Sequence, residues 1–325
     1  MRVIFKAAAL ALSFAALLPV AQGSDAYPSK SIHIVIGYAP GGSADIVGRV
    51  LAQELSTSMG KPVIVENKPG ANALIATKEV LKASPDGHTV LLTSLSHVVN
   101  PILNPKLADY DPINSFAPVS LIATLPLVVV TADSAPFSSI KDLTQKARSS
   151  PGSVTYGSAG NGGSGHLAGA MLALSAEVEM THIPFKGNAP ALTEVMAGRV
   201  SYTFFPMVGI AEHVQQKRLK VLATATKERM SQFPGVPTMA EAGFQGFEET
   251  AIWLGLMAPA GTPPDITDRL YKEISKALSL PHVRKRLEGL GAVPAGTSPQ
   301  DFSNYLNSDL DRWARVIKAS GIRTD

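Results

Sequence analysis

Two glycine-rich turns carry the chemistry that this sequence suggests most directly. The first, APGGS at residues 39–43, follows the β-branched run Ile32–Ile36 and precedes a helical pattern of apolar residues from Ile46 to Met59. A helix that starts directly after such a turn points unpaired backbone N–H groups and the positive end of its dipole into the space that the turn lines. Because glycine lets a ligand approach the backbone closely, the turn suits a small anion such as a carboxylate. An ordinary strand-to-helix turn gives the same pattern.

The second turn repeats this arrangement. The strand VTYGS at residues 154–158 leads into AGNGGSG at residues 159–165, and a helical pattern runs from His166 to Leu174. The glycine spacing also fits the dinucleotide pattern G-x-G-x-x-G, but the following strand ends in IPFK (residues 183–186) without the acidic residue that would hold a ribose. A carboxylate therefore suits this turn better than a nucleotide.

The remaining candidates follow other strands that end at the same edge. Because ligands of parallel sheets bind beyond the carboxyl ends of the strands, residues 39–45, 66–71 and 94–97 should share one rim of the first sheet. We predict that backbone N–H groups of both turns and the hydroxyl groups of Ser43, Ser94, Ser158 and Ser164 hold the ligand. The candidate ligand-binding residues are Ala39, Pro40, Gly41, Gly42, Ser43, Asp45, Ser94, His97, Ser158, Gly160, Asn161, Gly163, Ser164, His166, Lys186, Phe205 and Pro206.

Several of these side chains have a structural interpretation beside the functional one. Asp45 lies in the first turn of its helix, where the dipole alone favours a carboxylate. His97, His166 and His182 lie near strand ends or helix starts and act either as packing or capping residues or as hydrogen-bond donors to a ligand. Lys186 is either a solvated turn lysine or a positive charge at the rim of the second lobe.

The sequence shows no sign of an enzyme, a metal site or a cofactor. The nucleophile elbow of a serine hydrolase requires G-x-S-x-G, whereas GGSGH (residues 162–166) and GGSAD (residues 41–45) both lack the last glycine. The seven histidines are scattered without a metal-binding spacing. We therefore expect a binding protein with neither metal nor cofactor.

The start of the chain predicts export. Arg2 and Lys6 precede an apolar stretch (residues 7–20) and small residues, so residues 1–23 are predicted to be a secretory signal peptide that is removed to leave Ser24 first. The alternative, an uncleaved membrane anchor, would need a longer apolar stretch. Removal leaves 27 basic and 26 acidic residues, which argues against nucleic-acid binding. With no cysteine for a lipid anchor or disulfide, we expect a periplasmic protein and, by default, a monomer.

The order of the predicted elements indicates two lobes. The first part reads strand–helix–strand–helix–strand, which implies a parallel sheet, and residues 100–116 read as irregular. An apolar extended stretch (residues 117–131) crosses to a second lobe, and a strand near residues 250–257 returns. The predicted fold class is a two-lobed α/β fold, each lobe a sheet flanked by helices, with a hinge of two crossing segments. The predicted lobes are residues 24–125 with 252–325, and residues 126–251.

A collinear series of motifs resembles the Bug receptors, the extracytoplasmic solute-binding proteins of tripartite tricarboxylate transporters. The resemblance runs from residue 27 to the C-terminus, and its order makes it more specific than any one motif. The motifs are YPSKSI (27–32), YAPGG (38–42) with Asp45, ENKPGA (66–71), PDG (85–87), YGSAG (156–160), GHL (165–167), HIPFKG (182–187), PTMAEAG (237–243) and WLGLMAPAGTP (253–263).

The resemblance implies a two-lobed periplasmic receptor that closes on a small carboxylate and delivers it to integral membrane permease subunits. It also implies that main chain and ordered water at residues 39–45 hold one carboxylate, and that the turn at residues 158–166 contributes from the second lobe. Many members carry an aspartate at the strand tip that here reads FFP (residues 204–206). Its absence argues against an amino-acid ligand, and Phe205 with Met207 suggests an apolar lining for a longer aliphatic or aromatic acid.

Two other functions remain open at this point. A secreted hydrolase could use the same cleft, but it would need an activated nucleophile paired with a base. A periplasmic carboxylate sensor subunit would bind the same ligand and signal to a membrane kinase, and the sequence does not distinguish it from a transport receptor.

Overall fold

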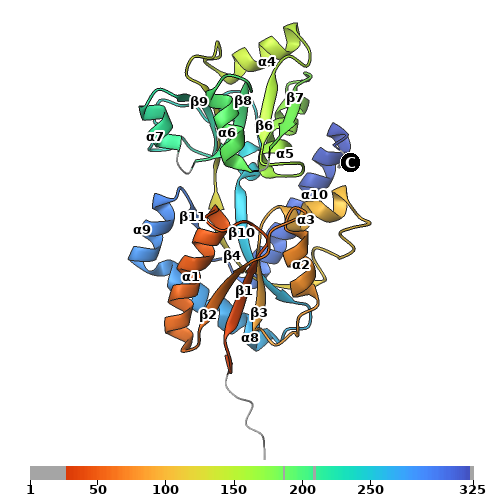
Figure 1. The fold of residues 1–325 in the computed structure, drawn as a ribbon, viewed down its shortest axis with the longest axis vertical. Coiled ribbons are helices and arrows are strands. Elements are labelled where there is room, and N and C mark those ends of the chain that lie inside the picture. The colour runs from red at the N-terminus through yellow and green to blue at the C-terminus, as the bar shows by residue number, and fades with distance from the viewer. Residues whose placement is uncertain (1–26, 186, 208–209, 323–325) are drawn as a thin grey trace, which may run out of the picture.

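The computed structural model describes residues 27–185, 187–207 and 210–322, and it divides the chain into two lobes, each built on one β-sheet (Figure 1). The predicted signal peptide and Lys186 lie outside the described residues. The predicted α/β class, with a sheet flanked by helices in each lobe, is confirmed.

The first lobe contains a six-stranded sheet in the order β11-β4-β10-β3-β1-β2. Its strands β1, β2 and β3 are parallel, and β10 runs antiparallel to both β3 and β4. The strands are β1 (Ile32–Ile36), β2 (Val63–Asn67), β3 (Thr89–Thr93), β4 (Phe116–Leu125), β10 (Ile252–Pro259) and β11 (Val293–Pro294). The helices are α1 (Ser43–Met59), α2 (Leu74–Leu81), α3 (Ser96–Leu103), α8 (Pro264–Ser279), α9 (Pro281–Gly289) and α10 (Pro299–Ser320).

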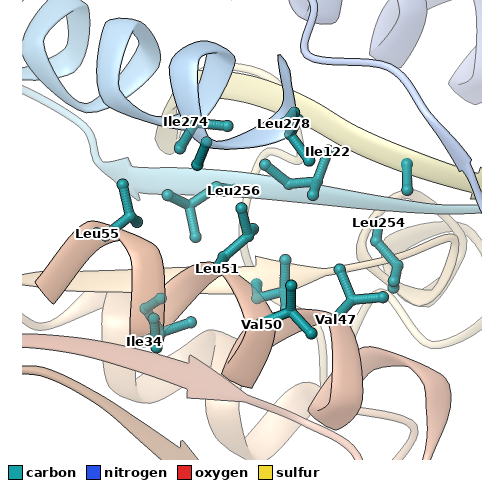
Figure 2. Close-up of a cluster of buried hydrophobic side chains, with 14 of the residues drawn as sticks. Ile34, Val47, Val50, Leu51, Leu55, Ile122, Leu254, Leu256, Ile274 and Leu278 are labelled. Carbon is teal, nitrogen blue, oxygen red and sulfur yellow. The ribbon is translucent and has the colours of Figure 1, made fainter. Parts of the chain in front are cut away.

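Helix α1 is held by the apolar face that its sequence spacing predicts. Val47, Leu51 and Leu55 belong to a buried cluster together with Ile34 of β1 and Leu256 of β10, as Figure 2 shows. Each of these five side chains is at most 1% exposed. Burying a leucine side chain contributes about 1.5–3 kcal/mol, so this packing fixes the start of α1 firmly above the sheet.

The second lobe contains a five-stranded sheet in the order β7-β6-β8-β5-β9. Strands β6, β7 and β8 pair in parallel, and β5 is antiparallel to β8 and β9. The strands are β5 (Leu127–Ala132), β6 (Thr155–Ser158), β7 (Thr181–Pro184), β8 (Tyr202–Pro206) and β9 (Leu219–Ala225). The helices are α4 (Ile140–Ser149), α5 (Ser164–Ser175), α6 (Asn188–Met196), α7 (Ile210–Gln215) and the 3₁₀ helix η1 (Phe247–Thr250).

Two segments cross between the lobes side by side. Strand β4 of the first sheet and β5 of the second are separated by Pro126 alone, where the sequence analysis expected one extended stretch. Proline has no N–H to donate to a sheet, and it marks the point where the chain changes sheets. The returning strand begins at Ile252, which pairs with Leu125. The predicted hinge of two crossing segments is therefore present.

Helix α3 lies where the sequence analysis expected an irregular segment from residue 100 onward. Pro101 lies inside this helix and cannot donate to the carbonyl group of His97 four residues earlier. The Tyr110 hydroxyl group donates to that carbonyl at 2.8 Å instead. A side chain nine residues further along the chain thus replaces the missing helical hydrogen bond. Local sequence patterns do not reveal this replacement.

Candidate functional site

The first glycine turn places the start of α1 at the carboxyl end of β1. Gly41 has φ +80°, which favours glycine, and Gly42 caps the helix in an extended conformation (φ −76°, ψ 168°). The first helical backbone bond runs from Ile46 N–H to Gly42 O at 3.0 Å. Within the described residues, the N–H groups of Ser43, Ala44 and Asp45 have no hydrogen-bond acceptor, and no side chain caps the helix.

The second turn has nearly the same backbone. Gly162 has φ +75°, Gly163 caps α5 with φ −76° and ψ 161°, and Leu167 N–H donates to Gly163 O at 3.0 Å. Here too the first three N–H groups of the helix, those of residues 164–166, lack an acceptor in the described part of the chain. Each lobe therefore presents three unpaired donors at a helix N-terminus, which is a favourable environment for a carboxylate.

The two turns differ at the residue four positions after the positive-φ glycine. In the first turn, Gly41 N–H donates to Asp45 Oδ2 at 2.9 Å, and Arg49 Nε donates to both carboxylate oxygens of Asp45 at 3.0 and 3.1 Å. Burial acts to raise the pKa of Asp45, but the hydrogen bonds from Arg49 and Gly41 outweigh it and lower this pKa. Asp45 is buried and fully engaged, which supports its structural interpretation.

In the second turn, a neutral imidazole takes the place of that carboxylate. Gly162 N–H donates to His166 Nδ1 at 3.1 Å, so the proton of the neutral ring lies on Nε2. Burial lowers the pKa of His166 to about 4. The ring stacks on His182 with centroids 3.7 Å apart and an interplanar angle of 8°. His166 supports the backbone of the turn, which is a role that the sequence analysis left open.

His182 takes part in this arrangement although it was not among the predicted site residues. It lies on β7 opposite Tyr156 of β6, a register that the sequence does not reveal. Its Nε2 lies 2.7 Å from Ser158 Oγ, and that hydroxyl group also donates to Gly160 O at 2.9 Å. Ser158 is 2% exposed, so its hydroxyl group orders the turn and contributes little accessible surface.

The other predicted side chains on the first-lobe rim are buried. His97 is completely buried, its Nε2–H donates to Pro112 O at 2.7 Å, and its ring packs edge-on against Phe116. Helix α3 turns the ring into the core, which supports its packing role, and ligand binding by His97 stays a prediction. Ser94 is buried beside Tyr38, whose hydroxyl group is 2.7 Å from Ser96 Oγ.

The predicted apolar lining of the second lobe also lies in the core. Phe205 and Met207 are 8% and 9% exposed and belong to one cluster with Val128 and Leu192. The suggestion that these side chains line the ligand space loses its support, because the alternation of β8 turns Phe205 toward that cluster and Met207 packs in the same cluster. Pro206 is buried as well. The predicted residues with accessible surface are Ala39, Pro40, Gly41, Gly42, Ser43, Gly160, Asn161, Gly163 and Ser164.

The second turn also lies against the first lobe. A Cβ atom on Gly162 would come within 2.8 Å of Leu103 Cδ1 and 3.4 Å of Val99 Cγ1, both on α3. Beside this contact lies a cavity of about 260 Å³, lined by Asn161 of the turn and by Asn72, Asn100 and other residues of the α2–α3 region. A larger hollow of about 650 Å³ lies at the amino-terminal ends of β1 and β3, away from both turns. In the described part of the chain, no cluster of three or more acidic or histidine residues could hold a metal ion.

Two opposed lobes, each with an uncapped helix start at the carboxyl end of its sheet, define a solute-binding protein of the periplasmic type. Residues 47–322 match the family model described as tripartite tricarboxylate transporter family receptor. The chain is 33% identical over 302 residues to the protein BugT of Bordetella pertussis, and the alignment covers 92% of each chain. The chain belongs to this receptor family, and the resemblance to Bug receptors is confirmed.

Solved structures agree with this assignment. The periplasmic binding protein BugD is 30% identical, with a TM-score of 0.80 over 92% of this chain and 100% of that one. Rpa4515 of R. palustris, solved with adipate, is 32% identical, with a TM-score of 0.82 over 91% and 99% of the two chains. MatC of Rhodopseudomonas palustris, with bound malate, is 32% identical, with a TM-score of 0.79 over 90% and 100%.

Proposed function

We propose that this chain is a periplasmic receptor that captures a small organic carboxylate and passes it to the membrane permease subunits of a tripartite tricarboxylate-type transporter. The observation that carries this proposal is the pair of matching turns, each with three unpaired N–H groups at an uncapped helix start. Of the residues that the structure describes, none belongs to a helix long and apolar enough to cross a membrane. The proposed signal peptide at residues 1–23 would direct the protein to the periplasm.

We propose further that the preferred ligand carries two carboxylates, one for each turn. Both turns offer similar backbone donors, and Arg49, the cationic side chain beside the first turn, is already engaged by Asp45. The related proteins with bound adipate and malate support an acid of this kind. The burial of Phe205 removes the reason to expect an aromatic acid.

The proposed lobe boundaries are residues 24–125 with 252–325, and residues 126–251. They are supported by the change of sheet at Pro126 and by the return of the chain before Ile252. With these boundaries the ligand space lies between the lobes, and closure would remove water and strengthen the hydrogen bonds to the carboxylates. A monomer is proposed as the functional unit.

A hydrolase is the alternative that one contact favours, because Ser158 Oγ lies 2.7 Å from His182 Nε2. Burial and the neighbouring His166 lower the pKa of His182 to about 3, which makes it a weak general base at neutral pH. Ser158 is buried and also bonds Gly160. Both facts support a structural pair over a catalytic one. Hydrolysis of chromogenic esters that is lost in Ser158→Ala would favour the enzyme.

The proposal is tested by thermal unfolding of mature protein that has been unfolded and refolded to remove bound ligand. The panel contains adipate, malate, citrate, monocarboxylic acids, aromatic acids and amino acids. A ligand at 100 times its Kd adds about 2.7 kcal/mol of stability, so a clear rise in Tm is expected with dicarboxylic acids. No rise with any acid would overturn the proposal. Loss of acid uptake on deletion of neighbouring permease genes would separate transport from sensing.

A further inference from the structure

Helix α10 belongs to the first lobe but reaches the second. It packs against β4, α3 and α8 of the first lobe, and it also contacts α5 of the second. Figure 1 shows its carboxyl end, marked C, beside the second lobe. The helix is 22 residues long, about 33 Å at 1.5 Å per residue, so it is long enough to span the junction between the two lobes.

The direct contact with α5 is apolar and lies next to the second turn. Leu167 of α5 is completely buried and belongs to one cluster with Trp313 and Ile317 of α10 and with Trp253 of β10. Leu167 directly follows His166, whose N–H is one of the three unpaired donors of the turn. The core of the first lobe therefore holds the amino-terminal end of α5, the helix that presents these donors.

A buried carboxylate fixes α10 at this level. Asp309 accepts hydrogen bonds from Trp253 Nε1 at 2.8 Å, from Trp313 Nε1 at 3.0 Å and from Arg312 Nη1 at 2.8 Å. Asp309 is 1% exposed, and burial raises its pKa to about 6. Removing any of these partners would leave a buried charge undersatisfied, so the helix has one well-defined position on β10.

Arg312 connects this anchored position to the returning segment. Its Nε lies 2.8 Å from Glu249 Oε2, and its Nη1 donates to the backbone carbonyl of Glu249 at 3.2 Å. Glu249 belongs to η1, the last segment before the chain enters β10. Phe247 of the same segment is completely buried and stacks on Phe204 of β8 at 5.6 Å. Arg312 thus links a first-lobe helix to a segment packed in the core of the second lobe.

We propose that Arg312 and Leu167 are positioning residues for ligand capture, through which α10 holds the second-lobe turn at its working distance from the first-lobe turn. This inference rests on the proposed function, since it concerns the same pair of turns. It adds residues that lie outside both turns and that need not touch the ligand.

Ligand affinity depends on the fraction of molecules that already have the binding arrangement. A ligand that binds both turns needs them at one separation, and the apparent Kd rises in inverse proportion to the fraction of molecules that has this separation. The buried contacts of α10 with α5 and η1 favour that arrangement before any ligand arrives. Weakening them should therefore weaken binding without removing a single ligand contact.

The test uses Arg312→Met, which keeps the volume but removes the contacts to Glu249 and the hydrogen bond to Asp309. It also uses Glu249→Gln, a milder change at an exposed side chain that leaves the Asp309 contacts intact. Arg312→Lys retains the charge, and Arg315→Met is the matched control, because Arg315 is exposed on the same helix and has no ion pair within the described residues. Adipate binding is measured by calorimetry. We expect the Kd to rise about tenfold in Arg312→Met and less in Glu249→Gln, with Arg312→Lys partly restored and Arg315→Met unchanged.

A ligand-free measurement separates this inference from the proposed function. Amide hydrogen exchange of residues 160–167 is expected to be faster in Arg312→Met and Glu249→Gln than in the wild type and in Arg315→Met. Unchanged exchange in both variants, or an unchanged Kd in both, would overturn the positioning role. If the wild type binds no acid at all, the proposed function fails, and the exchange result still decides whether α10 positions the turn.

Discussion

The two glycine turns have nearly the same backbone conformation but are supported by different side chains. Each needs an acceptor for the N–H of a glycine with positive φ, and the residue four positions later supplies it: Asp45 after Gly41, and His166 after Gly162. The first acceptor is an anion paired with Arg49, and the second is a neutral imidazole stacked on a second one. The backbone geometry is thus independent of the charge of its support.

The two turns therefore present similar backbone donors to a ligand but are stabilised by different side chains. Since the carboxylate of Asp45 is neutralised by Arg49 and His166 is uncharged at neutral pH, neither turn adds an unpaired side-chain charge to the unpaired N–H groups. The unpaired backbone donors at the two helix starts are then equivalent. What distinguishes the lobes is how each turn responds to acid, to added volume and to the loss of its support.

Acid should distinguish the turns most strongly. The unfolded chain protonates His166 near pH 6.5, whereas the folded chain does so only near pH 4. The contribution of His166 to the free energy of unfolding is therefore lost as the pH falls from about 6.5 to about 4, by about 2–3 kcal/mol. The pKa of Asp45 is lowered from 3.8, so the stability that its charged form contributes is lost only below pH 3.8. Urea unfolding of the wild type and His166→Asn between pH 7 and 4 measures the difference, and equal pH slopes would contradict it.

Added volume should affect only the second turn. A Cβ atom on Gly165 would come within 2.9 Å of Phe204 O, a backbone atom that cannot move away easily. Gly165→Ala should lower the free energy of unfolding by about 2 kcal/mol and weaken adipate binding more than about tenfold, because the donors shift. The equivalent residue in the first turn is Ala44, which fits, so Ala44→Gly should cost about 0.5–1 kcal/mol. Calorimetry that finds unchanged binding in Gly165→Ala would refute this prediction.

Removing the charged support should have a smaller effect. Asp45→Ala leaves the Gly41 N–H without its acceptor, which costs about 1 kcal/mol because Gly41 is exposed and water replaces the carboxylate in part. Asp45→Asn keeps an acceptor and serves as the control. Urea unfolding at pH 7 measures both, and a loss in Asp45→Asn as large as that in Asp45→Ala would show that the charge and not the acceptor matters.

The smallest effect is expected at the two serines that open the helices. Neither Ser43 nor Ser164 caps its helix with its side chain, so Ser43→Ala and Ser164→Ala should change the free energy of unfolding by less than about 0.5 kcal/mol. Each should weaken adipate binding about threefold through one lost hydroxyl contact, with Ser58→Ala as an exposed control in α1. Effects on only one turn would break the proposed equivalence of the lobes.

Local sequence patterns predicted the elements that depend on short-range signals. The β-branched run of β1, the glycines of both turns and the apolar face of α1 each specify their structure within a few residues, and both turns were identified in this way. Pro101 and Asn100 resemble loop residues, so the sequence does not predict helix α3. The hydrogen bond from Tyr110 that replaces the one lost at Pro101 requires a contact in three dimensions.

Local sequence patterns do not predict the direction of side chains. His97 follows a strand at the correct rim, yet α3 turns it onto Phe116. The contact of His182 with Ser158 depends on the register between β6 and β7, which the sequence does not show. Position along the chain thus predicts which edge of a sheet a residue reaches, but not whether its side chain faces the ligand or the core.

The carboxylate of Asp309 also has an optical consequence. The chain contains two tryptophans, and both indole N–H groups donate to this one side chain. The intrinsic tryptophan fluorescence of the protein therefore originates entirely at the junction between α10 and β10. A rearrangement of the lobes that strains this junction, or protonation of Asp309 near pH 6, should change the emission, so the kinetics of capture can be followed without any added label.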